Sequence, residues 1–212
     1  SGFNVQVDTL TADISGPTDN GTIDIDAIYN VYLNDNLTAG PGSLSNINIT
    51  ATEGDVEQTG GNMLAGQDVD IDGREGVDLN GTIGAGTAIG VNVDIDSAMG
   101  TVTIDGNITA NGDVLVDAAN NITVGSGADI TADANTSGAG NVVMNADTDS
   151  SSAGDLTINN DSTVTGERVT LTGYNVTSDV VTARNGSNAA GTMITITGEH
   201  DVTINDSTTV SS

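Results

Sequence analysis

Cysteine and tryptophan are absent from the chain, and its aromatic side chains amount to one Phe and three Tyr in 212 residues. The absence of Cys excludes a disulfide framework and a thiolate metal site. With so few aromatic side chains, the chain cannot assemble a bulky globular core. No apolar run approaches the ~18 residues that a membrane-spanning helix needs, so insertion into a membrane is not expected.

Positive charge is also scarce, since three Arg and no Lys stand against 30 acidic residues and give a net charge of −27. A surface this acidic repels nucleic acid and anionic membranes, so neither is predicted as a partner. The acids are 25 Asp and only five Glu. Asp suits tight turns and short-armed cation ligation, whereas a general gain in solubility could use Glu equally well.

One short alternating pattern recurs along the chain at intervals of 18 to 28 residues. Its copies are NVQV (4–7), TIDI (22–25), NINI (46–49), DVDI (68–71), NVDI (92–95), DVLV (113–116), NVVM (141–144), RVTL (168–171) and MITI (193–196). Such recurrence predicts a solenoid, in which each coil lays a strand on the coil before it. Most coils carry three strand-like runs separated by Gly, Asn, Asp or Ser, which predicts an all-β, triangular coil with up to three short strands.

The repeats divide the chain into nine coils of a single domain, residues 1–212. The coils are 3–20, 21–45, 46–66, 67–90, 91–112, 113–140, 141–166, 167–191 and 192–212. Because successive strand side chains point to opposite sides, the first strand of every coil places two apolar columns inside. These columns are Val5, Ile23, Ile47, Val69, Val93, Val114, Val142, Val169, Ile194 and Val7, Ile25, Ile49, Ile71, Ile95, Val116, Met144, Leu171, Ile196.

Asn or Asp precedes this strand in six of the nine coils. The residues are Asn4, Asn46, Asp68, Asn92, Asp113 and Asn141. Stacked at a bend, such side chains can form hydrogen bonds along the rod, which gives them a structural role.

Several runs resemble a known group of proteins. They are GDVLVDAANNITVGSGADITADA (112–134), GNVVMNA (140–146), GDLTINNDSTVTGERVTLTG (154–173) and GEHDVTIND (198–206). They look like the repeats of filamentous haemagglutinin-type and related β-strand-repeat exoproteins, and the resemblance covers residues 91–212 best. It implies a right-handed parallel β-helix exported to the cell surface as an adhesive or fibrous element, with a host or surface glycan as a partner.

Acidic residues recur at equivalent outward positions of neighbouring coils. In this register Asp70 lies over Asp94, and Asp72, Asp96 and Asp117 form a stack at a spacing of about 4.8 Å. Like charges directly opposed on neighbouring strands are destabilising. A bridging calcium ion is one remedy, because calcium takes several oxygen ligands in flexible geometry, and solvation with screening is the other. These five Asp are the candidate calcium ligands, and no other cofactor is expected.

An enzymatic function is the alternative hypothesis, because parallel β-helices also carry polysaccharide lyases and hydrolases. Paired carboxylates indicate this only weakly in a chain that has Asp in every coil. A lyase acting on acidic sugars needs cations to neutralise its substrate, and the three Arg (Arg74, Arg168 and Arg184) are divided between two distant coils, 67–90 and 167–191. The single histidine, His200, lacks a nucleophile motif such as GxSxG. The sequence therefore favours a protein that is not an enzyme.

Repeat-like sequence runs from NVQV near the start to TINDSTTV near the end. Solenoids normally carry atypical terminal caps, because an open last coil presents unpaired backbone groups and bare core. We therefore expect end-to-end self-association into filaments, through an interface of Val5, Val7, Ile194, Ile196, Val202 and Ile204, or a segment of a longer adhesin. Irregular loops that serve as caps are the third explanation. A contact between unlike ends that does not close propagates into a fibre.

Eleven Asn-x-Ser/Thr triplets also occur in the chain. Some can carry glycans in a host that glycosylates asparagine. The pattern also arises from composition alone, since an Asn-rich corner followed by a Thr-rich strand writes Asn-Ile-Thr without selection.

Overall fold

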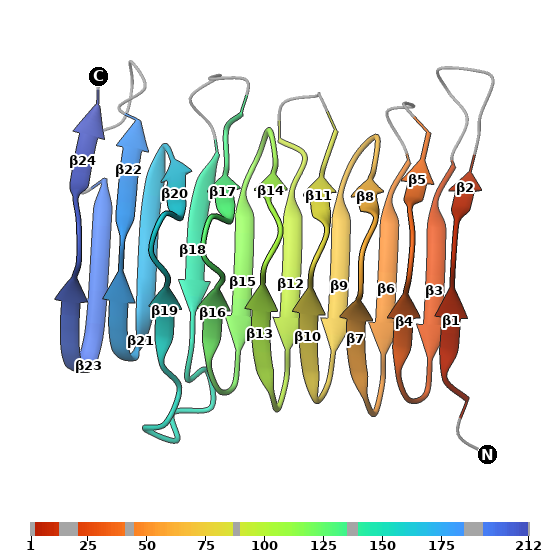
Figure 1. The fold of residues 1–212 in the computed structure, drawn as a ribbon, viewed down its shortest axis with the longest axis horizontal. Coiled ribbons are helices and arrows are strands. Elements are labelled where there is room, and N and C mark those ends of the chain that lie inside the picture. The colour runs from red at the N-terminus through yellow and green to blue at the C-terminus, as the bar shows by residue number, and fades with distance from the viewer. Residues whose placement is uncertain are drawn as a thin grey trace.

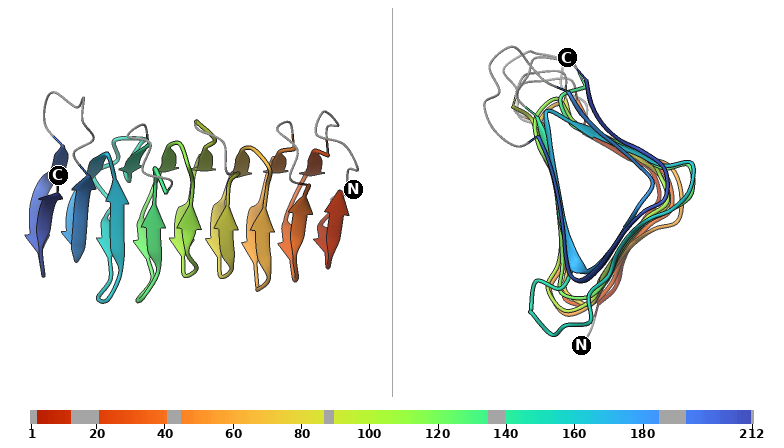
Figure 2. Two further views of the ribbon diagram at one scale, coloured as in Figure 1. Left: turned by 90° about the horizontal axis from the view of Figure 1, so that it is seen from above. Right: turned by 90° about the vertical axis from the view of Figure 1, so that its left-hand side faces the viewer.

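The computed structural model describes residues 3–12, 21–40, 45–86, 90–134, 140–184 and 193–211. The chain forms a right-handed parallel β-helix of triangular cross-section, as the end-on view in Figure 2 shows. Every strand pairing among the described residues is parallel, for example β12 with β9 and with β15. Within the described ranges no helix is long and apolar enough to cross a membrane.

The first face of the triangle carries the strands that the repeat pattern identifies (Figure 1). They are β3 (Ile23–Ala27), β6 (Ile47–Ala51), β9 (Val69–Gly73), β12 (Val93–Ser97), β15 (Val114–Ala118), β18 (Asn141–Asn145) and the first parts of β21 (Arg168–Ser178) and β23 (Ile194–Ile204). Eight strands in the described part of this face are separated by seven steps, so the rod makes about seven turns. The prediction of nine coils was slightly too high.

The second face follows each corner. It holds β1 (Val5–Val7), β4 (Val31–Leu33), β7 (Asp55–Gln58), β10 (Gly76–Leu79), β13 (Thr101–Ile104), β16 (Ile122–Val124), β19 (Leu156–Ile158) and the later parts of β21 and β23. The two faces count as one sheet because β21 passes through the corner unbroken, pairing first with β18 and then with β19.

The third face is a separate ladder of short strands. It holds β2 (Leu10–Ala12), β5 (Leu37–Ala39), β8 (Asn62–Leu64), β11 (Thr82–Gly84), β14 (Ile108–Thr109), β17 (Asp129–Thr131), β20 (Thr163–Gly166), β22 (Val180–Arg184) and β24 (Thr208–Ser211). The described chain thus winds through first, second and third face in order and then starts the next turn.

The predicted core columns are confirmed through the middle of the rod. In the first face Val69, Val93, Val114 and Val142 follow one another in register, and each has 0% of its surface exposed. Burying a side chain of this size stabilises the fold by roughly 1.5–3 kcal/mol. Stacked small aliphatic side chains therefore replace the aromatic core that the composition excludes.

The alignment of the first tetrapeptide was wrong. Val5 pairs with Val31 and Val7 with Leu33, so NVQV lies on the second face and not in the column of Ile23 and Ile25. All three faces alternate apolar and polar residues, and alternation alone does not distinguish one face from another. The 18-residue step after NVQV is the shortest of the series. It is short because NVQV lies on the second face, one strand later in its coil than the other tetrapeptides.

The Asn and Asp residues before the first-face strands hydrogen-bond from coil to coil, as predicted. The backbone N–H of Asn92 donates to Asp68 Oδ1 at 2.7 Å, and that of Asp113 donates to Asn92 Oδ1 at 2.8 Å. The series extends from Asn46 to Asn141. Asn4 makes the same bond on the second face, where it accepts from the N–H of Asn30. Each such bond contributes about 1 kcal/mol.

Both ends of the described rod leave apolar side chains in contact with solvent. At the first coil Phe3 is 63% and Leu10 is 40% exposed, while at the last coil Val202 and Ile204 are each 47% exposed. The strands at these ends pair on one side only among the described elements, since β1 pairs with β4 and β23 with β21. Among the described residues, β1 and β23 are therefore the edge strands of the sheet.

Candidate functional site

The five predicted acidic residues lie together on the outward side of the first face. Asp94 stands opposite Asp70, and Asp96 stands opposite Asp72 on one side and Asp117 on the other. The strands β9, β12 and β15 hold these positions because their inward neighbours are locked in the core. We call this group of five the acidic ladder.

Neutral residues border the acidic ladder on both sides. Asn48 and Thr50 of β6 stand opposite Asp70 and Asp72. At the other border Asn145 donates from Nδ2 to Asp117 Oδ1 at 2.7 Å. On the described first face, the like-charged pairs are thus confined to three successive coils, and an amide donor relieves Asp117 at the border.

Burial and mutual repulsion raise the pKa values of the central carboxyls. The pKa of Asp94 rises to about 6, first because the group is partly buried and then because of the charges of Asp96, Asp70, Asp117 and Asp72. Burial is also the largest cause that raises the pKa of Asp70, Asp72 and Asp96. Asp70, Asp72, Asp94 and Asp96 therefore take up protons more readily than isolated Asp side chains.

Among the described residues no three acidic, histidine or cysteine side chains converge on a point where they could hold a metal ion. The ladder is a row, because outward side chains of neighbouring strands stand side by side at about 4.8 Å. A calcium ion between two rungs would take only part of its six to eight oxygen ligands from the protein. Calcium binding at these residues stays a prediction.

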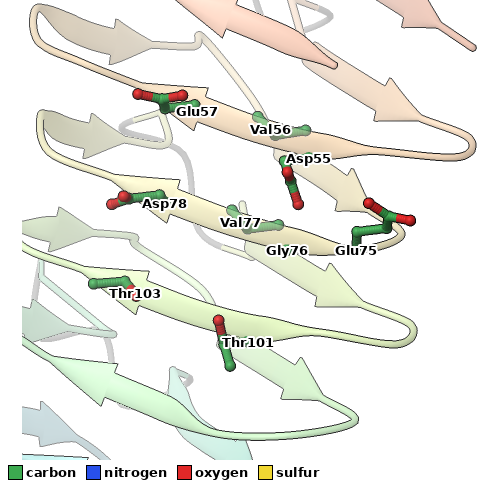
Figure 3. Close-up of a pocket in the computed structure, with 9 residues that line it drawn as sticks. All are labelled: Asp55, Val56, Glu57, Glu75, Gly76, Val77, Asp78, Thr101 and Thr103. Carbon is green, nitrogen blue, oxygen red and sulfur yellow. The ribbon is translucent and has the colours of Figure 1, made fainter. Parts of the chain in front are cut away.

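A second acidic group on the neighbouring face was not predicted. Asp55, Glu57, Glu75 and Asp78 line a shallow cavity of about 250 Å³ over β7, β10 and β13 (Figure 3). Asp78 stands opposite Glu57, and its pKa is raised by burial first and then by the charges of Asp105 and Glu57. Aligning the second run of each coil (DVEQ, GVDL, TVTI) would have revealed this group.

One of the three arginines lies at the corner beside the acidic ladder. A cavity of about 360 Å³ there is lined by Arg74, Asp72 and Asp96 together with small residues of the same corner. The Arg74 guanidinium Nε donates to Met99 Sδ at 3.3 Å. The corner thus presents one cation next to two carboxylates.

The single histidine lies in β23, several coils away from the acidic ladder. His200 Nδ1 is 2.9 Å from Asp201 Oδ2 and 3.2 Å from Asn175 Oδ1, and its ring stacks on Tyr174 with centroids 5.4 Å apart. Side chains from adjacent coils hold the ring on the outer surface. These contacts include no serine or threonine hydroxyl that His200 would activate.

No family model matches the chain, and it has no significant match among curated proteins or solved structures. What defines its class is the fold, a parallel β-solenoid built from sequence repeats. The resemblance to filamentous haemagglutinin-type repeats agrees with this architecture, and kinship with that family stays a prediction.

Proposed function

We propose that the protein is a structural or adhesive rod that works outside the cell or on its surface and performs no catalysis. The observation that carries the proposal is the regular stack of coils, in whose described part the first and last strands pair on one side only and carry exposed apolar side chains. A carbohydrate-active enzyme is the less favoured function, because neither acidic group combines with the histidine and only one arginine lies beside the acidic ladder.

The columns of the second face support an end-to-end contact between copies. Following the register from strand to strand, the column that begins at Val5 ends at Val202, and the one that begins at Val7 ends at Ile204. The β1 strand of one copy can therefore continue the second face of another copy beyond β23. Burial of apolar surface at ~25 cal/mol per Å² favours this contact.

The side-chain hydrogen bonds at the corner before the second face point in one direction along the rod, which is the direction that a head-to-tail stack requires. Asn4 and Asp201 occupy the same register position at opposite ends. In four coils between them the later residue's N–H donates to the side chain of the preceding coil; the donors are Asn30, Asp55, Asp155 and Asn175. The Asp201 carboxylate of one copy can accept from the Asn4 N–H of the next. The first end supplies donors and the last end acceptors, so copies would join head to tail.

The first face sets a limit on this assembly. Ile194 and Ile196 belong to the column of Ile23 and Ile25, so across a junction they would face β3 instead of Val5 and Val7. With β1 placed on β23, the described first face is one strand short between β23 and β3. A segment of a longer solenoid would supply such a strand in continuous chain, and this is the second form of the proposal.

Electron microscopy of variants tests the filament form. Val7→Lys should block assembly, because it places a charge in the apolar contact, while Gln6→Lys adds the same charge on the exposed side of the same strand and should leave assembly intact. The samples should stand in about 1 M salt, where a Debye length of ~3 Å suppresses repulsion between acidic rods. Short single rods from all three proteins at high concentration would contradict filament formation.

A further inference from the structure

Three Asn-x-Thr triplets place their asparagine at an exposed corner of the rod. Asn36, Asn107 and Asn121 each accept a hydrogen bond at Oδ1 from the backbone N–H of the next coil, at 2.9, 2.9 and 2.8 Å. All three residues are exposed. Within the part of the chain that the structure describes, their Nδ2 atoms have no hydrogen-bond partner, so one atom of each amide serves the fold and the other faces solvent.

Two other triplets place their asparagine differently. Asn48 and Asn175 are half-buried, and their Nδ2 atoms donate to Asp24 Oδ1 at 2.6 Å and to Asp155 Oδ1 at 2.8 Å. Asn48 stands in the middle of a strand on the first face, between Asp24 and Asp70. A substituent on either Nδ2 would replace one of the two amide hydrogens beside a neighbouring carboxylate and would crowd the neighbouring coil.

We propose that Asn36, Asn107 and Asn121 are sites of N-linked glycosylation and that Asn48 and Asn175 stay unmodified. The amide Nδ2 attacks the anomeric carbon of a sugar that carries a diphosphate leaving group. The carbon–nitrogen bond forms as the carbon–oxygen bond to the diphosphate breaks, the diphosphate leaves with the electron pair, and a base of the transferase takes one amide proton. The product amide keeps its Oδ1, so the coil-to-coil hydrogen bond survives the modification.

The three sites share a position at the start of a strand. Asn36 and Asn107 precede β5 and β14 at the corner between the second and third faces, and Asn121 precedes β16 at the corner before the second face. A glycan at these corners leaves the core columns and the terminal edges uncovered. The inference rests on the proposed location outside the cell, where a hydrated, protected surface has a use.

Mass spectrometry of the protein purified from its own cells tests the inference. Mapped glycopeptides should carry sugar at Asn36, Asn107 and Asn121 and none at Asn48 or Asn175. An oligosaccharide added as one block would indicate a lipid-linked donor, and single hexoses a nucleotide-linked donor, and either result supports the sites. Sugar at Asn48 and Asn175 to the same extent would overturn the structural selection.

Substitution of the third residue of each triplet provides matched variants, because it keeps the asparagine and its hydrogen bond. Thr38→Ala, Thr109→Ala and Thr123→Ala should each remove one glycan mass, whereas Thr50→Ala and Thr177→Ala should leave the mass of the glycan unchanged. Circular dichroism confirms that each variant is folded. Protein recovered from the cell surface with Asn36, Asn107 and Asn121 all unmodified would overturn this inference alone. Protein found only inside the cell would overturn the proposed location, and with it the inference.

Discussion

The first face differs between its middle and its last coils although the core beneath is the same. In the middle, Asp94 stands between Asp70 and Leu115, whereas in the last coils Thr170 stands opposite Thr195 and Thr172 opposite Thr197. The inward neighbours Ile95 and Leu171 are both 0% exposed. The inward columns thus determine the coil, and the outward columns are free to differ in charge.

The two outward surfaces have opposite effects on the sheet. Directly opposed threonines contribute roughly 0.2–1 kcal/mol per pair, while directly opposed like charges are destabilising. In the acidic middle, burial of the core therefore stabilises the coils, while repulsion between the outward carboxylates destabilises them. Its stability should depend on pH and cations in a way that the threonine coils do not share.

A charge placed inside the tube should lower the free energy of unfolding more than any other change. The loss should be similar in the acidic middle and in the threonine coils, because their cores are alike. Ile95→Asp and Leu171→Asp both put an unpaired carboxylate into a fully buried position, at a cost of several kcal/mol in the free energy of unfolding. Asp94→Asn, one residue from Ile95 and facing outward, is the matched control and should not destabilise the protein at pH 7. Urea denaturation measures all three, and a loss of under ~1 kcal/mol for either buried variant would contradict the shared core.

Acidification should have the next largest effect, and on the first face it should act on the acidic middle more than on the threonine coils. The pKa of Asp94 is raised to about 6 in the folded state from 3.8, so the folded protein binds more protons between these values. Because stability falls with rising pH wherever the folded state binds more protons, the melting temperature should rise as the pH is lowered from 7 towards 4. After allowance for solvent screening, a gain of about 1 kcal/mol corresponds to roughly 2–4 °C.

A pair of charge-removing variants separates this effect from the general repulsion of an acidic rod. Asp94→Asn should reduce the rise in melting temperature on acidification. Asp206→Asn removes the same charge from an exposed position near the last strand and should leave that rise unchanged. Equal pH profiles for the two variants would show that overall charge, and not the ladder, is responsible.

Cations should produce the smallest difference between the regions. Calcium is expected to raise the melting temperature more than sodium chloride of equal ionic strength does, because a divalent ion can contact carboxylates of two neighbouring strands. Asp96→Asn, which removes the central rung of the stack, should reduce the excess. Identical melting curves with calcium and with excess chelator would leave screening as the sufficient explanation.

Much of this architecture could be predicted from the sequence because the side-chain period of a strand is two and the repeats are regular. The columns through Val69, Val93 and Val114 and the opposition of Asp96 to its neighbours follow from that register alone. The face of the first strand could not be predicted, because NVQV fits the alternation of the second face as well as that of the first. The cavity beside Asp78 was missed because it is built from second-face strands, whose register the first-face repeats do not reveal.

The number of residues that pair neighbouring coils has a mechanical consequence. Hydrogen bonds between parallel coils run along the rod, so a tensile load passes through every junction in series and the weakest junction sets the breaking force. The first described coil pairs with the next through three residues of β1 and three of β2, whereas the last junction has nine pairs between β21 and β23 and four between β22 and β24. Under tension the described rod should therefore part first beside β1 and β2 and hold firmest near its final coils.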